Sequence, residues 1–158
     1  MVRPHPGAGG GRAVSVAERA LSKSRRPIGR WRIEIMNGKH TWYVFLWPTK
    51  ERLRVVVKDK DAVGFHHPRP YWINRETGEK MAPRCMGHIH IALDHYSHGI
   101  VMHELLHAMM HGLDVLGPTL EEMANDMSVE EDIVHEWSKA FQELYRNIWE
   151  RDQELGVR

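Results

Sequence analysis

The five residues His103-Glu104-Leu105-Leu106-His107 form an H-E-x-x-H motif. On a helix, residues four apart lie one turn above each other, so the two imidazoles can reach a single metal ion while Glu104 stands beside it. Neighbouring positions are apolar almost all round, which is typical of a buried helix: Ile100, Val101, Leu105, Leu106, Ala108, Met109 and Leu113. Because unpaired buried polar groups cost about 1–3 kcal/mol each, these side chains need a partner.

Zinc suits this ligand set, and a catalytic Zn²⁺ takes three protein ligands and one water. His111 is not expected to be the third ligand, since it lies eight residues beyond His103, about 12 Å of helix rise. In the alternative interpretation, His103 and His107 are core histidines bonded to backbone carbonyls, and Glu104 faces solvent. The motif favours the metal site.

The third ligand must come from another segment. Ser128 to Glu131 resembles a capping box that opens a long helix running towards Glu150. Glu130 falls in the middle of its apolar stripe, whereas Glu131 lies about 100° away and would cap the backbone N–H of Ser128. The stripe comprises Ile133, Val134, Trp137, Phe141, Leu144 and Ile148.

Glu130 is therefore the predicted third ligand. Glu131 is the next candidate, followed by Glu121, Glu122, Asp126 and His135. In the alternative interpretation, Glu130 and Glu131 only favour the positive end of the helix dipole.

The chain of 158 residues is long enough for one domain. Its charge is unevenly distributed along the sequence. Residues 1–30 carry a net charge of +6 and the remainder −5. Residues 1–29 are predicted to be a disordered basic tail and residues 30–158 a single domain. The tail allows a weak contact with nucleic acid or an acidic partner, but its composition favours a solubilising or unused extension. Cys85 is the only cysteine, which excludes intrachain disulfides and favours the cytoplasm. We expect neither a secretory signal nor a membrane span.

Alternation of apolar residues predicts strands at Trp31–Ile35 and Thr41–Trp47, joined by a tight turn at Asn37-Gly38. A third strand is expected at Leu53–Lys58 and an irregular stretch at 61–84.

A fourth strand is expected at Met86–Leu93, with His88 and His90 facing solvent. The motif helix should begin after Ser97 and end at Gly112. A short helix is expected to open at Thr119–Glu122. Together these predict an α+β fold, with a small antiparallel sheet of about four strands followed by the motif helix and a long C-terminal helix.

The motif helix and the glutamate-bearing helix after it resemble the gluzincin arrangement of the zincin metallopeptidases. The stretch from Gly87 through His103–Ala108 to Glu130–Val134 resembles small zincin-like proteins of phage and prophage origin. The resemblance implies a strand running into the active-site helix, with zinc held by His103, His107 and a glutamate. It also implies that the strand His88–Leu93 binds extended substrate along its edge.

These features predict a zinc-dependent peptidase or amide hydrolase acting on a peptide or protein substrate. A metal-activated water would attack the carbonyl, and Glu104 would serve as general base. One alternative is a non-catalytic binding module in which zinc only stabilises the fold. Another is a DNA-associated protease, suggested by the basic tail. The chain lacks the downstream His or Tyr motif with which well-studied peptidases stabilise the oxyanion.

Overall fold

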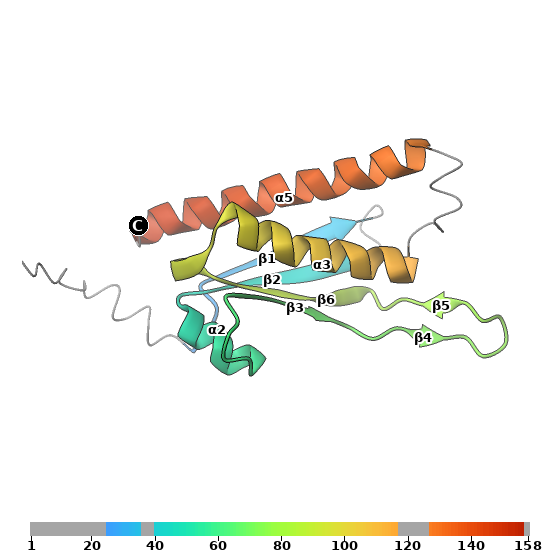
Figure 1. The fold of residues 1–158 in the computed structure, drawn as a ribbon, viewed down its shortest axis with the longest axis horizontal. Coiled ribbons are helices and arrows are strands. Elements are labelled where there is room, and N and C mark those ends of the chain that lie inside the picture. Colours follow the sequence, from blue (N-terminus) through green and yellow to red (C-terminus); the bar gives the residue numbers. More distant parts are fainter. Residues whose placement is uncertain (1–24, 36–39, 117–126, 157–158) are drawn as a thin grey trace, which may run out of the picture.

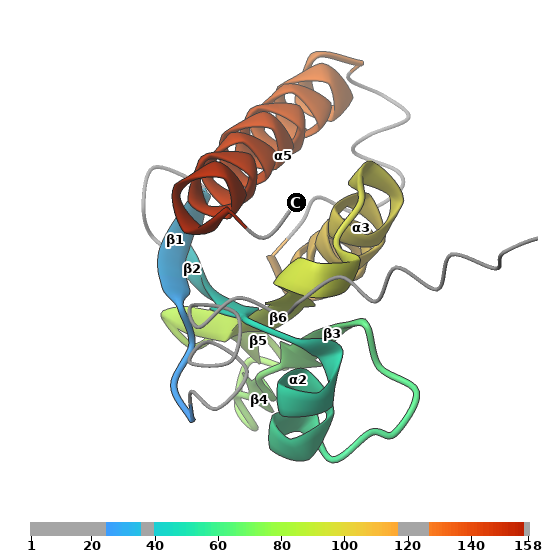
Figure 2. The ribbon, with the colours of Figure 1, turned by 90° about the vertical axis from the view of Figure 1, so that its left-hand side faces the viewer.

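A four-stranded sheet with two helices on one face organises the molecule (Figures 1 and 2). The computed structural model describes residues 25–35, 40–116 and 127–156. The strands are β1 (Gly29–Ile35), β2 (His40–Trp47), β6 (Cys85–Ala92) and β3 (Gly64–Pro68), in the order β1-β2-β6-β3. The helices over this face are α3 (His98–Leu116) and α5 (Met127–Leu155). The predicted α+β class and the long C-terminal helix are confirmed.

The prediction of an antiparallel sheet is wrong, because the sheet is mixed. β2 pairs with β1 in the antiparallel sense and with β6 in the parallel sense, while β3 is antiparallel to β6. A parallel pair needs a long crossover connection. The segment between β2 and β6 provides it and includes both α2 (Lys50–Val57) and β3.

The core lies between the sheet and the two helices. Alternate residues of β2 and β6 point into it, and they meet apolar residues of both helices. The members from these four elements are Trp42, Val44, Leu46, Met86, Ile89, Ile91, Val101, Leu105, Ala108, Val115, Trp137, Leu144 and Ile148. Trp42 and Trp137 meet edge to face, with ring centroids 5.3 Å apart.

The motif helix does not end at Gly112 but continues for four residues to Leu116. Gly112 is buried, and a Cβ there would lie 3.2 Å from the Trp42 ring and 3.6 Å from the Trp137 ring. The glycine thus allows close packing rather than terminating the helix. The predicted start is confirmed, since the backbone N–H of Ile100 donates to Ser97 Oγ at 3.2 Å.

The segment predicted as a third strand, Leu53–Lys58, is instead largely helix α2. Thr49 Oγ1 accepts a hydrogen bond from the backbone N–H of Arg52, and Lys58 ends the helix at φ 59°. Leu53 is fully buried against Trp47 and Ala92 on the face of the sheet opposite α3 and α5. The alternation of Leu53, Val55 and Val57 had favoured a strand, but the Thr49 cap opens a helix in which Leu53 is buried and Val55 and Val56 are exposed.

The stretch 61–84, expected to be irregular, contains the edge strand β3 and a small hairpin of β4 (Trp72–Ile73) and β5 (Lys80–Met81). The fourth predicted strand is confirmed as β6. His88 is half-buried, and the expectation that His90 faces solvent is wrong. His90 is buried, because its ring stacks with those of Phe45 and Trp47, and Trp47 Nε1 donates to its Nδ1 at 3.0 Å.

The folded part includes residues just before the predicted domain boundary at 30. The Ile28 backbone N–H donates to Leu46 O at 2.8 Å, and Arg151 Nε donates to Ile28 O at 3.0 Å. Residues 1–24 and the predicted short helix at 119–122 lie outside the described residues. Within the described ranges, no helix is long and apolar enough to cross a membrane.

Candidate metal centre

His103 and His107 lie together on the exposed side of α3. Their Nε2 atoms are 3.1 Å apart, and their ring planes are nearly perpendicular. A tetrahedral zinc with Zn–N bonds of 2.0–2.1 Å would hold two nitrogens about 3.3 Å apart. The expected juxtaposition of these two imidazoles is therefore present, and the donors match those that zinc prefers.

Glu104 points towards the edge strand β3 and is buried, with 6% of its surface exposed. Its carboxylate accepts a hydrogen bond from the backbone N–H of His66. A Cβ on Gly64 would lie 2.7 Å from Glu104 Oε1, so the strand backbone covers the carboxylate closely. Burial raises the pKa of Glu104 to about 7, against the opposing effects of the His103 charge and the His66 hydrogen bond. The carboxylate can thus exchange a proton near neutral pH.

An open hollow of about 440 Å³ lies beside this carboxylate. The first two turns of α3 form one wall and the loop that leads into β3 forms the other. Its lining residues are Asp59, Asp61, Ala62, Val63, Gly64, Gly99, Ile100, His103 and Glu104. Solvent and a small substrate group can therefore reach both His103 and Glu104 from one side.

The structure does not bring Glu130 to the two histidines. Glu130 and Glu131 are both exposed in the first turns of α5, and the described residues contain no group of three potential ligands close enough to hold a metal ion. Of the predicted apolar stripe, Trp137, Leu144 and Ile148 are buried, whereas Val134, one turn after Glu130, is 50% exposed. Among the other candidates, His135 is exposed, whereas Glu121, Glu122 and Asp126 lie outside the described residues.

The predicted capping box also does not match the observed start of α5. Helix α5 begins at Met127, so Ser128 lies inside the helix rather than before it. Glu131 is therefore not at the third helical position that a capping box requires.

Both β3 and β6 border the motif helix, but only β3 lies at an edge of the sheet. The resemblance implied substrate binding along the edge of His88–Leu93, but β6 is paired with β2 on one side and β3 on the other. β3 lies at the edge of the sheet, and Glu104 of α3 lies against its Gly64. The edge of the sheet next to Glu104 is thus the outer side of Gly64–Pro68, where the His66 N–H is already bonded to the Glu104 carboxylate.

His66 was not predicted to belong to the site. Its ring lies parallel to that of His107, with centroids 6.5 Å apart, and 5.9 Å from the ring of His111. Burial and the neighbouring histidines lower the pKa of His66 to about 4, so it is neutral at pH 7. The alternation of Phe65 and His67 with Gly64 and His66 was the only sequence signal for this strand.

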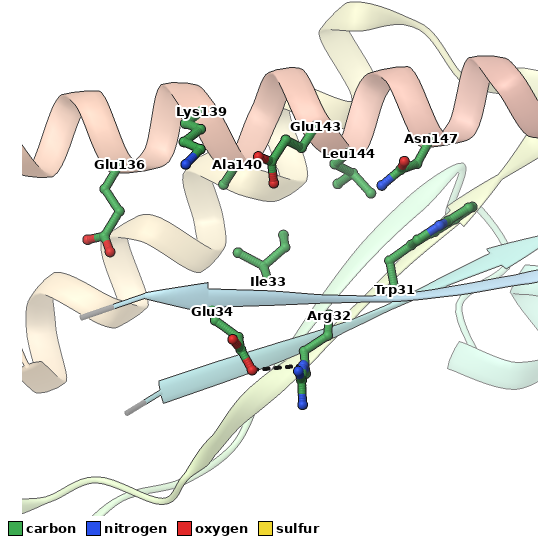
Figure 3. A pocket seen from close by; sticks show the side chains of 10 residues that line it. All are labelled: Trp31, Arg32, Ile33, Glu34, Glu136, Lys139, Ala140, Glu143, Leu144 and Asn147. Atoms are coloured by element: carbon green, nitrogen blue, oxygen red, sulfur yellow. Dashed lines mark ion pairs between the residues drawn. The ribbon is translucent and has the colours of Figure 1, made fainter. Parts of the chain in front are cut away.

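A second hollow, of about 190 Å³, lies between β1 and α5 (Figure 3). Trp31 and Ile33 point from β1 towards α5, and the opposite wall carries Glu136, Lys139, Glu143 and Asn147. Arg32 and Glu34 point the other way and form an ion pair. This hollow contains no histidine or cysteine, so the chemistry of the motif lies elsewhere.

No protein-family model matches the chain, and neither the curated proteins nor the solved structures gave a match. The residues of the site are therefore the basis for inferring its function.

Proposed function

We propose that the protein is a zinc-dependent peptidase or related amide hydrolase. The observation that carries this proposal is the arrangement on α3, where two imidazole nitrogens lie 3.1 Å apart beside a buried carboxylate with a pKa of about 7. A pair of core histidines would instead be buried and bonded to carbonyls, whereas His103 and His107 are exposed. The donor set fits zinc better than it fits a structural role.

His103 and His107 would hold the metal, with a carboxylate as third ligand. Glu130 remains the candidate that the sequence suggests. Its carboxylate would reach the two histidines only if the first turn of α5 moved towards α3. When bound, zinc supplies a Lewis acid that activates water and polarises the scissile carbonyl.

Glu104 acts as the general base in this proposal. With a pKa of about 7 it accepts the proton of the attacking water and passes it to the leaving amine. The His66 backbone N–H orients one carboxylate oxygen, and the absence of a side chain at Gly64 leaves room for the other. Both groups come from β3, so the edge strand positions the base.

The substrate class follows from the same strand. Extended peptides bind exposed sheet edges through main-chain hydrogen bonds. The outer side of β3 offers such an edge next to Glu104, and the hollow beside His103 can receive a side chain. A peptide or protein segment in extended conformation therefore fits the site.

The test combines metal analysis with a hydrolysis assay on the full chain. Wild type and Glu104→Gln should both bind one zinc, whereas His103→Ala and His107→Ala should lose it. Hydrolysis of a quenched fluorescent peptide library should require zinc and disappear in Glu104→Gln. If all four proteins bind zinc equally, the metal site is elsewhere. If wild type binds zinc but cleaves no peptide, the metal serves a non-catalytic binding module.

A further inference from the structure

The sheet has a second face, opposite α3 and α5, with an unusual combination of side chains. By strand register, it carries aromatic rings, arginines and histidines in adjacent rows. We call this surface the open sheet face and define it by Arg30, Arg32, Tyr43, Phe45, Phe65, His67 and His88, together with Arg69 just after β3. Helix α2 covers only the neighbouring end, where Trp47 and Ala92 pack on Leu53.

The aromatic rings of this face are accessible. Tyr43, Phe45 and Phe65 are each half-buried, so their rings are supported by the sheet and partly open to solvent. The Arg30 guanidinium lies over two of them, 4.9 Å from the Tyr43 centroid and 5.5 Å from that of Phe45. The His90 ring stacks on Phe45 with centroids 5.2 Å apart, so Tyr43 and Phe65 are the rings that a base can reach. Flat rings held on a rigid sheet are the usual platform for stacking nucleic-acid bases.

The charge of this face is positive. Arg30, Arg32 and Arg69 are exposed. On the described strands the only acid of this face is Glu34, and its carboxylate pairs with Arg32 at 2.8 Å. Burial and the neighbouring groups Arg69, His67 and Arg30 lower the pKa of His88, so the positive charge here comes from the arginines.

We propose that the open sheet face binds single-stranded nucleic acid. Bases stack on Tyr43 and Phe65, Arg30 turns from the Tyr43 ring to contact a phosphate, and Arg69 contacts a second phosphate. An acidic peptide would match the charge but would leave the rings without stacking partners. The site lies on the opposite side of the sheet from His103 and Glu104, so it is independent of the proposed hydrolase activity.

The experiment measures fluorescence anisotropy of labelled single-stranded RNA and DNA of about 12 nucleotides, within the usual site size of such surfaces. Full-length wild type should bind with an affinity that falls steeply between about 50 and 200 mM salt. The double variant Arg30→Gln/Arg69→Gln should bind about tenfold more weakly at low salt. Its salt slope should be smaller by about 1.4, since each phosphate contact to a single strand contributes roughly 0.7.

Stacking is tested separately from charge. Tyr43→Leu should weaken binding about fivefold or more, whereas Tyr43→Phe, which keeps the ring, should bind like wild type. Arg146→Gln removes an exposed arginine from α5 and is the matched control, expected to change affinity less than twofold. Melting temperatures of all variants should match wild type, which separates lost binding from lost fold.

Several outcomes would overturn the proposal. Wild type that binds neither oligonucleotide has no such site. Binding that survives both the arginine and the Tyr43 variants comes from another part of the chain. Tighter binding to vesicles of anionic lipid than to oligonucleotides would identify a membrane surface as the partner, and equal binding to duplex DNA would show that stacking has no role.

Discussion

Gly64 of the edge strand lies directly against the carboxylate of Glu104. A Cβ at residue 64 would sit 2.7 Å from Oε1 and 2.8 Å from Cγ of this glutamate. Such distances are shorter than ordinary van der Waals contact, so either the strand or the carboxylate would have to move. The position of the proposed base is thus set by a missing side chain on a neighbouring strand.

Replacing this glycine should separate catalysis from metal binding. Gly64→Ala should abolish most hydrolysis while keeping zinc, because the added methyl displaces Glu104 and leaves the two histidines in place. The free energy of unfolding should fall by about 1–3 kcal/mol from overpacking. Gly99→Ala is the control for the position of Glu104, since its methyl would be added to the other wall of the same hollow and would meet only Ser97 Oγ at 3.8 Å. Normal activity in Gly64→Ala would show that Glu104 does not need this contact.

The raised pKa of Glu104 predicts a pH dependence of stability in the metal-free protein. The folded-state pKa of about 7 exceeds the ordinary value of 4.5, so the folded protein holds the proton more tightly. Stability should therefore fall as pH rises from about 4.5 to 7, by at most about 3 kcal/mol. In Glu104→Gln this loss should be absent, as urea titrations in chelator at several pH values would reveal. Parallel curves for the two proteins would contradict the burial of this carboxylate.

The lowered pKa of His90 predicts a pH dependence of stability in the opposite direction, with stability lost as the pH falls. Its pKa is lowered from 6.5 to about 4, first by burial and then by His88 and His67. Stability that depends on neutral His90 is complete above about 6.5 and is lost as pH falls towards 4. His90→Phe should be less stable than wild type at pH 7 by about 1–3 kcal/mol, because the Trp47 N–H loses its acceptor. The difference should shrink by pH 4, and a constant difference in denaturant midpoints would argue against the titration of His90.

The third ligand is tested by two matched substitutions at the start of α5. Glu130→Gln should lose zinc to a chelator much faster than wild type, because the substitution removes the charged carboxylate oxygen that would bind the metal. Glu131→Gln is the control and should retain it. If only Glu131→Gln loses zinc, the helix is rotated by about 100° from the predicted phase. Retention in both variants would direct attention to Glu121, Glu122 and Asp126.

Features set by local chemistry could be predicted from the sequence. The helix bearing His103 and the long helix containing Trp137 follow from apolar periodicity, and the start of α3 follows from the Ser97 cap. Strand β6 was recognisable because Ile89 and Ile91 alternate with His88 and His90. These patterns span only neighbouring residues, so one sequence contains enough information to identify them.

Features that depend on distant partners could not be predicted in the same way. Nothing near His90 in the sequence indicates that Trp47 will bond to it, and nothing near Gly64 indicates that Glu104 will lie against it. Leu53, Val55 and Val57 alternate as in a strand, yet the segment is a helix whose Leu53 packs against Trp47 and Ala92 of the sheet. The surroundings of Glu104 therefore depend on the packing of β3 beside α3, which the residues near Glu104 in the sequence do not indicate.

The composition of β3 has a consequence for self-association. An exposed strand edge is a template on which further copies of a chain can add, and long flat edges lead to aggregation. This edge is only five residues long and ends at Pro68, which has no N–H to offer a neighbouring strand. It is therefore long enough to hold a short guest segment but too short and too abruptly ended to seed a continuous intermolecular sheet.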